Sequence, residues 1–89
     1  MPPRRESTPL SLRHAAFGEA VRQLRERRNW SQEDLSDEAD VHISQISGIE
    51  RGTSNTTIRT LGRVADGLQT GLGEIWTLAD RLGEEGAVG

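Results

Sequence analysis

Apolar side chains recur every three or four positions through most of the chain, which is the spacing of one face of an α-helix. Short segments rich in polar residues or Gly separate these stretches. The pattern predicts an all-α fold of five helices, over residues 12–28, 32–39, 42–50, 56–68 and 71–82. The side chains expected to form the core are Ala16, Phe17, Ala20, Val21, Leu24, Leu35, Ala39, Ile46, Ile49, Ile58, Leu61, Val64, Ala65, Leu68, Leu72 and Ile75.

The ends of the predicted helices carry residues that favour helix starts and stops. Ser31 and Asp34 have the spacing of a capping box, in which each side chain bonds the other residue's backbone amide. Asn29 and Gly52 tolerate the left-handed backbone conformation that follows many helices. Asp40 also tolerates a positive φ, so a tight corner is predicted between the second and third helices.

The third predicted helix has two unlike sides. Ile46, Ile49 and Glu50 share one side, because residues three and four apart are neighbours on a helix. The opposite side carries only uncharged residues, namely Ile43, Ser44, Ser47 and Gly48. This side is suited to lie against a flat or grooved partner.

These motifs resemble the helix-turn-helix of the phage-repressor and Cro type, also called the xenobiotic-response-element family. LRERRNWSQEDL resembles the first connection of that family, and VHISQISGIERG resembles its recognition helix. The match runs in register from Phe17 to Trp76, roughly two-thirds of the chain. The resemblance implies a five-helix, lambda-repressor-like DNA-binding domain that regulates transcription, with residues 42–50 as the recognition helix.

The resemblance implies two sets of contacts with double-stranded DNA. Base edges in the major groove would be read by Ile43, Ser44, Ser47 and Gly48. An Ile methyl group can contact a thymine methyl, and a Ser hydroxyl can bond a donor or an acceptor, so each half-site is expected to discriminate modestly. The side chains expected to contact phosphates are Gln32, Gln45, Arg51, Thr53, Ser54 and Asn55.

A further implication of the resemblance is an ion pair between Arg25 and Glu50, which would fix the angle between the first and third helices. Removing one member of a buried pair strands the charge of the other. Arg25→Ala is therefore expected to destabilise the domain more than Arg27→Ala.

The resemblance also implies a homodimer on an operator whose two half-sites lie about 34 Å apart, one turn of DNA. The last predicted helix carries an apolar stripe broader than a small domain is expected to bury. Leu72 and Ile75 fit the core, and the candidates for the dimer interface are Trp76, Ala79 and Leu82.

Length and composition exclude several classes of site. The 89 residues fit one small domain, and they include no cysteine, which excludes disulfides and thiolate metal sites. No phosphate-binding loop, zinc spacing or catalytic triad is recognisable, so no enzyme activity, metal or cofactor is expected. The absence of a signal peptide or a membrane-length apolar run favours a cytoplasmic protein with no membrane partner.

The distribution of charge is more informative than the net charge of -3. Residues 1–30 carry seven Arg and three acids, residues 31–50 carry six acids and no base, and residues 51–63 carry three Arg and no acid. Two positive segments therefore flank the motif, as phosphate contacts on both sides of a groove would require. A solvated surface is the alternative interpretation for any single Arg.

Three segments are predicted: a flexible arm over residues 1–12, the helix-turn-helix domain over 13–82, and a flexible tail over 83–89. Arg4 and Arg5 of the arm either reach into a minor groove or belong to a disordered end.

Two narrower functions, and a third alternative of a different class, remain open alongside the general regulator. The protein could be a controller of a restriction-modification operon, or an antitoxin that binds a toxin and its own promoter. RNA polymerase is a further candidate partner, since a bound dimer either blocks or recruits it. The third alternative is a protein-binding adaptor that has kept the fold and lost DNA affinity, which the acidic motif and the plain recognition face would favour.

Overall fold

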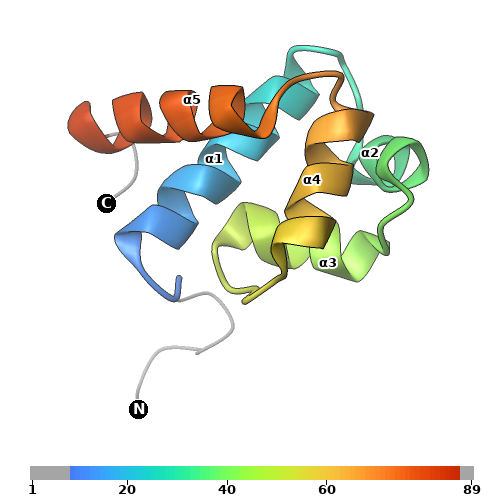
Figure 1. The fold of residues 1–89 in the computed structure, drawn as a ribbon, viewed down its shortest axis with the longest axis horizontal. Helices are drawn as coiled ribbons and strands as arrows, with labels where there is room; N and C mark the ends of the chain where they lie inside the picture. The colour runs from blue at the N-terminus through green and yellow to red at the C-terminus, as the bar shows by residue number, and fades with distance from the viewer. Residues whose placement is uncertain (1–8, 87–89) are drawn as a thin grey trace.

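The computed structural model describes residues 9–86, which form five helices and no strand (Figure 1). This confirms the predicted all-α fold. The helices are α1 (Leu12–Glu26), α2 (Gln32–Ala39), α3 (Ile43–Arg51), α4 (Ile58–Gly67) and α5 (Leu72–Glu84). Arg4 and Arg5 of the predicted arm lie outside the described residues.

All five helices contribute to one core. α1 packs against α5 on one side and against α3 on the other, while α2 packs against α3 and α4. Figure 1 shows α5 along the upper part of the view and α3 below it. The largest fully buried side chains are Val21 of α1, Leu35 of α2, Ile46 of α3, Val64 and Leu68 at α4, and Ile75 of α5. Burial of such a side chain contributes about 1.5–3 kcal/mol, so each helix is held by at least one strong apolar contact.

The chemistry of the helix ends follows the sequence closely. Ser31 accepts a hydrogen bond from the backbone of Asp34, and the Asp34 carboxylate accepts one from the backbone of Ser31, which confirms the capping box. Asn29 and Asp40 adopt positive φ angles of 58° and 55°. Gly52 ends α3 with a φ of 74°, as predicted.

Two glycines permit a close approach between helices. A Cβ atom on Gly18 of α1 would lie 2.2 Å from the carbonyl oxygen of Ile49 in α3. A Cβ atom on Gly67 of α4 would lie 2.8 Å from the Cα atom of Ala39 in α2. Both distances are shorter than a van der Waals contact, so only glycine fits at these two crossings.

The boundaries of the domain differ from the prediction at both ends. α1 starts at Leu12 with Ser11 as its N-cap, and the Leu10 amide donates to the Gly52 carbonyl over 2.8 Å. The last residues assigned to the arm therefore belong to the domain. α5 continues through Glu84, two residues into the predicted tail. Within residues 9–86, no helix has the length and apolarity needed to cross a membrane.

Candidate nucleic-acid interface

The corner between α2 and α3 places α3 at the surface of the domain. Asp40 turns the chain with its left-handed backbone, and Val41 is buried with 6% of its surface exposed. The Ser36 hydroxyl donates to the Val41 carbonyl over 2.6 Å, which ties the end of α2 to the corner. His42 is the N-cap of α3, where its side chain accepts from the Ser44 amide. The two helices therefore form a helix-turn-helix with a well-bonded corner.

The apolar side of α3 anchors it to the core, and the opposite side faces solvent. Ile46 and Ile49 are buried, with exposed fractions of 0% and 4%. Ile43, at the start of the helix, keeps 38% of its surface exposed. Ser44 is exposed and Ser47 is half-buried, so these three side chains are accessible to a partner.

The hydroxyl groups of the two serines have neighbours on α3 or at its N-cap. Ser44 Oγ lies 2.9 Å from His42 Nδ1, and the Arg51 guanidinium donates to Ser47 Oγ. These contacts are local and exposed, so a base edge can compete for either hydroxyl. Gln45 is also exposed on this helix, on the side of Ser44 away from Ser47.

Gly48 does not lie on the exposed side of α3, and its prediction as a base-reading residue was wrong. It is buried, and a Cβ atom added to it would lie 3.1 Å from Ser54 Cβ. The Gly48 carbonyl accepts from the Thr53 amide over 2.9 Å and from the Thr53 hydroxyl over 3.3 Å. Gly48 therefore allows the following loop to fold back on α3.

The loop after α3 divides the predicted phosphate-binding residues into two groups. Thr53 and Ser54 are half-buried because they pack against Gly48. Arg51 and Asn55 are exposed, and their side chains are accessible beside the end of α3.

The predicted pair of Arg25 and Glu50 is present, and it joins α1 to α3. Arg25 Nε donates to Glu50 Oε2 over 2.7 Å, and Arg25 Nη2 donates to Glu50 Oε1 over 3.0 Å. The remaining terminal nitrogen of Arg25 donates to the Trp30 carbonyl over 2.7 Å. The Glu50 side chain is only 3% exposed and that of Arg25 only 11%, and the hydrogen bonds to Glu50 raise the pKa of Arg25 above its ordinary value. The pair is thus a desolvated, two-pronged ion pair that ties α3 to α1.

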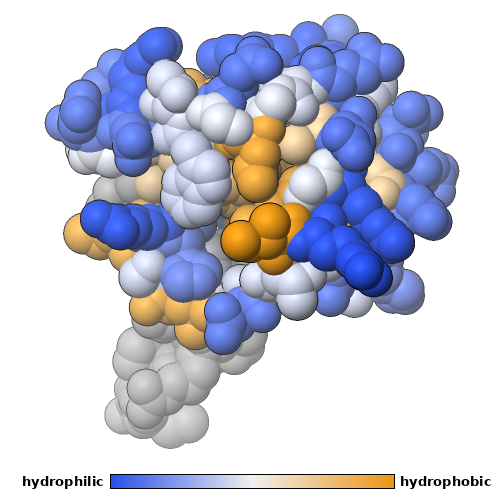
Figure 2. All heavy atoms as spheres, in the orientation of Figure 1, coloured by the Kyte–Doolittle hydropathy of each residue, from blue (hydrophilic) through white to orange (hydrophobic). Residues whose placement is uncertain are grey.

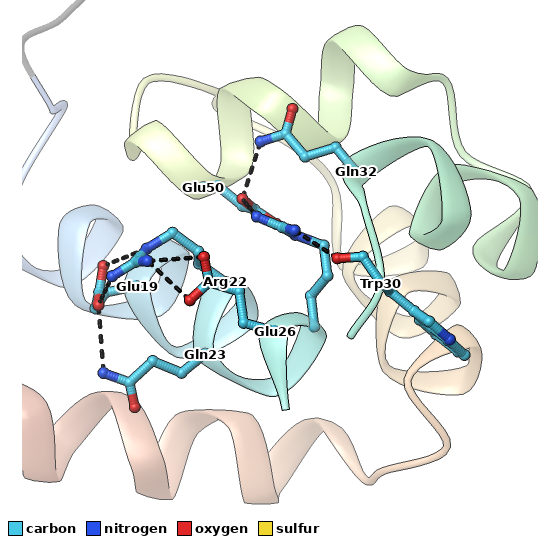
Figure 3. Close-up of polar contacts among 8 residues, drawn as sticks. Glu19, Arg22, Gln23, Glu26, Trp30, Gln32 and Glu50 are labelled. Atoms are coloured by element: carbon cyan, nitrogen blue, oxygen red, sulfur yellow. Dashed lines mark hydrogen bonds and ion pairs between the residues drawn. The ribbon is translucent and has the colours of Figure 1, made fainter. Parts of the chain in front are cut away.

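Gln32 belongs to the same network. Its side-chain amide donates to Glu50 Oε1 over 2.9 Å (Figure 3). An amide nitrogen carries two protons, so this bond leaves one N–H of Gln32 for another acceptor. Glu50 therefore binds both Arg25 of α1 and Gln32, the first residue of α2. The contact between Glu50 and Gln32 was not predicted from the sequence.

Two of the three residues predicted for the dimer interface lie in the core. Ala79 and Leu82 are 2% and 5% exposed, because α5 packs this side against α1. Their prediction as interface residues was therefore wrong. Trp76 keeps 38% of its surface exposed, and its ring centroid lies 4.6 Å from that of Phe17.

Ile58 departs from its predicted position in the core. It is 78% exposed, because it is the first residue of α4, directly after the N-cap Thr57. Leu61, one turn later, is half-buried, and Val64 is fully buried. The apolar stripe of α4 thus runs from the core outward to a large exposed side chain.

No cluster of three or more acidic or His side chains able to hold a metal ion occurs in the described part of the chain. The accessible side chains of the helix-turn-helix are instead uncharged ones on α3 and hydrogen-bond donors in the loop after it. Such side chains are suited to contact the bases and phosphates of a nucleic acid.

Comparisons with known proteins point to the same motif. The chain is 43% identical over 53 residues to control protein C.BamHI of Bacillus amyloliquefaciens, a match that covers 58% of this chain and 65% of that protein. It is 33% identical over 70 residues to a competence pilus inhibition repressor of Acinetobacter baylyi, covering 79% of this chain and 64% of the relative. The chain thus spans slightly less than two thirds of both relatives.

A solved structure of C.Esp1396I bound to a 19-base-pair DNA duplex matches with a TM-score of 0.73 and 25% identity, over 80% of this chain and 95% of that one. The helix-turn-helix family model matches residues 21–75, which include all of α2, α3 and α4. The chain belongs to the helix-turn-helix family, of the phage-repressor or xenobiotic-response-element type.

Proposed function

We propose that this chain is a sequence-specific, DNA-binding transcriptional regulator that acts as a homodimer on two half-sites, with α3 in the major groove. The observation that carries the proposal is the two-sided α3, which exposes Ile43 and Ser44 while Ile46 and Ile49 anchor it in the core. The likeness to C.Esp1396I bound to DNA supports this orientation of the fold. A role on DNA implies a cytoplasmic location, and no catalytic step is part of it.

Base readout is assigned to three residues of α3. The Ile43 side chain can contact a thymine methyl group, and the hydroxyl groups of Ser44 and Ser47 can bond base edges. Gly48 is not among them, because it is buried. Each of these contacts is weaker than a two-pronged Arg or Asn contact, so specificity depends on both half-sites together and on DNA shape.

Phosphate contacts are assigned to both ends of the motif. At the start of α2, the second amide proton of Gln32 can reach a phosphate while Glu50 holds the side chain in place. At the other end, Arg51 and Asn55 are exposed donors, and Gln45 lies on the flank of α3. Thr53 and Ser54 are half-buried and shape the loop. Their hydroxyl groups contribute to phosphate binding only where they remain accessible.

We further propose that the regulator is a controller protein of a restriction-modification system. The support is the 43% identity to control protein C.BamHI, together with the structural match to the restriction-modification controller C.Esp1396I. A match to a competence repressor supports the alternative that the chain represses an unrelated operon. Both versions use the same recognition face.

The double variant Ser44→Ala and Ser47→Ala is expected to weaken binding to a duplex that carries one preferred half-site by roughly 10- to 100-fold. Each lost hydrogen bond removes about 0.5–1.5 kcal/mol, and a tenfold change corresponds to 1.4 kcal/mol. Affinity for unrelated DNA should stay the same, because phosphate contacts supply it. Fluorescence anisotropy on both duplexes measures the two affinities.

Thr77→Ala is the matched control for these hydroxyl deletions. Thr77 donates to the Gly73 carbonyl within α5, and Figure 1 shows α5 on the opposite part of the domain from α3. The control should bind like the native chain. An unchanged preference in the double variant would contradict base readout by α3.

A further inference from the structure

The hydroxyl groups of Ser44 and Ser47 make intramolecular hydrogen bonds of opposite direction. Figure 2 shows hydrophilic side chains over much of one face of the domain, so polarity alone does not identify a base-reading residue. A hydroxyl group has one proton to donate and two lone pairs that accept. A neighbour that takes the proton leaves an acceptor for an outside partner, and a neighbour that takes a lone pair leaves the proton. The direction of each intramolecular bond therefore decides which kind of base group the hydroxyl can bind.

The hydroxyl proton of Ser44 is directed toward His42. The Ser44 amide donates to His42 Nδ1 over 3.2 Å, as part of the cap that begins α3. An imidazole nitrogen that accepts from an amide carries no proton, so the ring proton of His42 lies on Nε2. Ser44 Oγ lies 2.9 Å from the same Nδ1 atom, which makes the hydroxyl the donor in this contact. Ser44 Oγ therefore presents its lone pairs to solvent.

The hydroxyl of Ser47 has the opposite kind of neighbour. The guanidinium of Arg51, one turn later on α3, donates to Ser47 Oγ. A guanidinium has five N–H donors and no acceptor, so it occupies a lone pair of the hydroxyl and cannot take its proton. The Ser47 proton is therefore left for an outside acceptor.

We propose that Ser44 accepts a hydrogen bond from an exocyclic amino group of a base, and that Ser47 donates one to a base acceptor. In the major groove the amino groups are N6 of adenine and N4 of cytosine, and the acceptors are N7 of purines, O6 of guanine and O4 of thymine. Neither base contact displaces the intramolecular bond. His42 and Arg51 are then positioning residues for base recognition, each acting through a serine. The inference rests on the proposed function, since it names the base groups that the exposed side of α3 binds.

The test compares a duplex that carries one preferred half-site, selected beforehand from random DNA, with duplexes changed at one base. Purine in place of adenine, or pyrimidinone in place of cytosine, deletes the amino group. At the base that Ser44 contacts, this deletion should weaken native binding about threefold to tenfold. Ser44→Ala should be insensitive to the deletion, while Ser47→Ala should keep the full loss. Fluorescence anisotropy measures the affinities.

Removal of a base acceptor should show the converse pattern. Deazapurine lacks N7, and an amino base in place of a carbonyl base removes O6 or O4. One of these changes should weaken native binding but leave Ser47→Ala unaffected. Each duplex is measured with both chains, so the effect of the altered base on the duplex itself cancels.

Variants of His42 test its action through Ser44. At the base that Ser44 contacts, guanine for adenine or thymine for cytosine puts a carbonyl oxygen in the place of the amino group. His42→Ala should lose most of the native preference for the amino base, because the Ser44 proton can then bond the carbonyl. His42→Asn should restore the preference, since Asn is a preferred N-cap residue whose side-chain oxygen accepts as Nδ1 does. A role in holding the helix alone would lower the affinity for both duplexes equally.

His14→Ala is the matched control, because His14 Nδ1 lies 2.7 Å from the Ser11 hydroxyl at the start of α1. It should keep the native base preference at every position. A native chain that prefers one half-site but tolerates the loss of every amino group would overturn the inference and leave the proposed function standing. Full preference for the amino base in His42→Ala would do the same. A native chain that binds all duplexes equally would refute the proposed function, and this inference with it.

Discussion

Gly18→Ala is expected to lower the free energy of unfolding by about 3 kcal/mol, at the upper end of the effects of overpacking. The new methyl group would lie 2.2 Å from the Ile49 carbonyl oxygen and 2.6 Å from that of Glu50. Both are backbone atoms, so relief requires α3 to move away from α1. A domain of this size has roughly 5–10 kcal/mol of stability in total, so the loss is severe. Urea unfolding followed by circular dichroism measures it.

Gly62→Ala is the control for this effect. Gly62 also lies inside a helix, but a Cβ atom there would meet no other atom within 4 Å. Alanine should therefore stabilise the domain by about 0.5–1 kcal/mol, the difference in helix propensity. Gly18→Ala with the stability of the native chain would show that α1 and α3 do not approach as closely as described.

Arg25→Ala is expected to lower the free energy of unfolding by about 3 kcal/mol or more, as for other broken buried pairs. The variant leaves the Glu50 carboxylate, which is 3% exposed, without its cationic partner. Gln32 still donates one hydrogen bond to it, but an amide does not neutralise a charge. α3 should also lose its fixed angle to α1, so DNA affinity should fall even where the domain stays folded. Thermal and urea unfolding measure the first effect.

Two further variants distinguish the cost of leaving the Glu50 carboxylate unpaired from the cost of removing an arginine side chain. Arg27 is exposed, so Arg27→Ala should change stability by no more than about 0.5 kcal/mol. Adding Glu50→Gln to Arg25→Ala removes the stranded charge and should recover part of the lost stability. Equal melting temperatures for Arg25→Ala and Arg27→Ala would contradict a structural role for the pair.

Features set by short-range chemistry were predictable from the sequence. The capping box of Ser31 and Asp34 and the left-handed residues Asn29, Asp40 and Gly52 depend on backbone preferences within a few positions. They gave both ends of α2 correctly and the ends of α3 to within one residue, while α1 ends two residues before the predicted position. The pair of Arg25 and Glu50 was predicted only through the family resemblance, because 25 residues separate its members.

Helical spacing did not predict how deeply a side chain is buried or how closely two segments of the chain approach each other. The apolar stripe of α5 shows which side is buried, but not how far the burial extends, so Ala79 and Leu82 were misplaced. Ile58 lies on the apolar side of α4, yet the helix carries it beyond the edge of the core. Gly48 appeared to be an exposed reader because the fold-back of the following loop depends on contacts that spacing does not encode.

The recognition helix is held at its end by contacts with α1, and this links stability to function. Gly18 sets how closely the two helices approach, and Arg25 with Glu50 sets their angle. Gln32 joins the start of α2 to the same carboxylate. The proposed base contacts at the start of α3 and the proposed phosphate contact of Gln32 therefore share one rigid support.

The most direct test is quantitative footprinting of the native protein on DNA from upstream of its own gene, titrated against salt and compared with unrelated DNA. A dimeric regulator should protect two segments about 34 Å apart, one helical turn, with an affinity that falls as salt rises. The double variant Ser44→Ala and Ser47→Ala should lose protection of these two segments. If the protein binds neither the upstream DNA nor the unrelated DNA even at low salt, the exposed side of α3 is not a nucleic-acid interface. That result would support the alternative of a protein-binding adaptor.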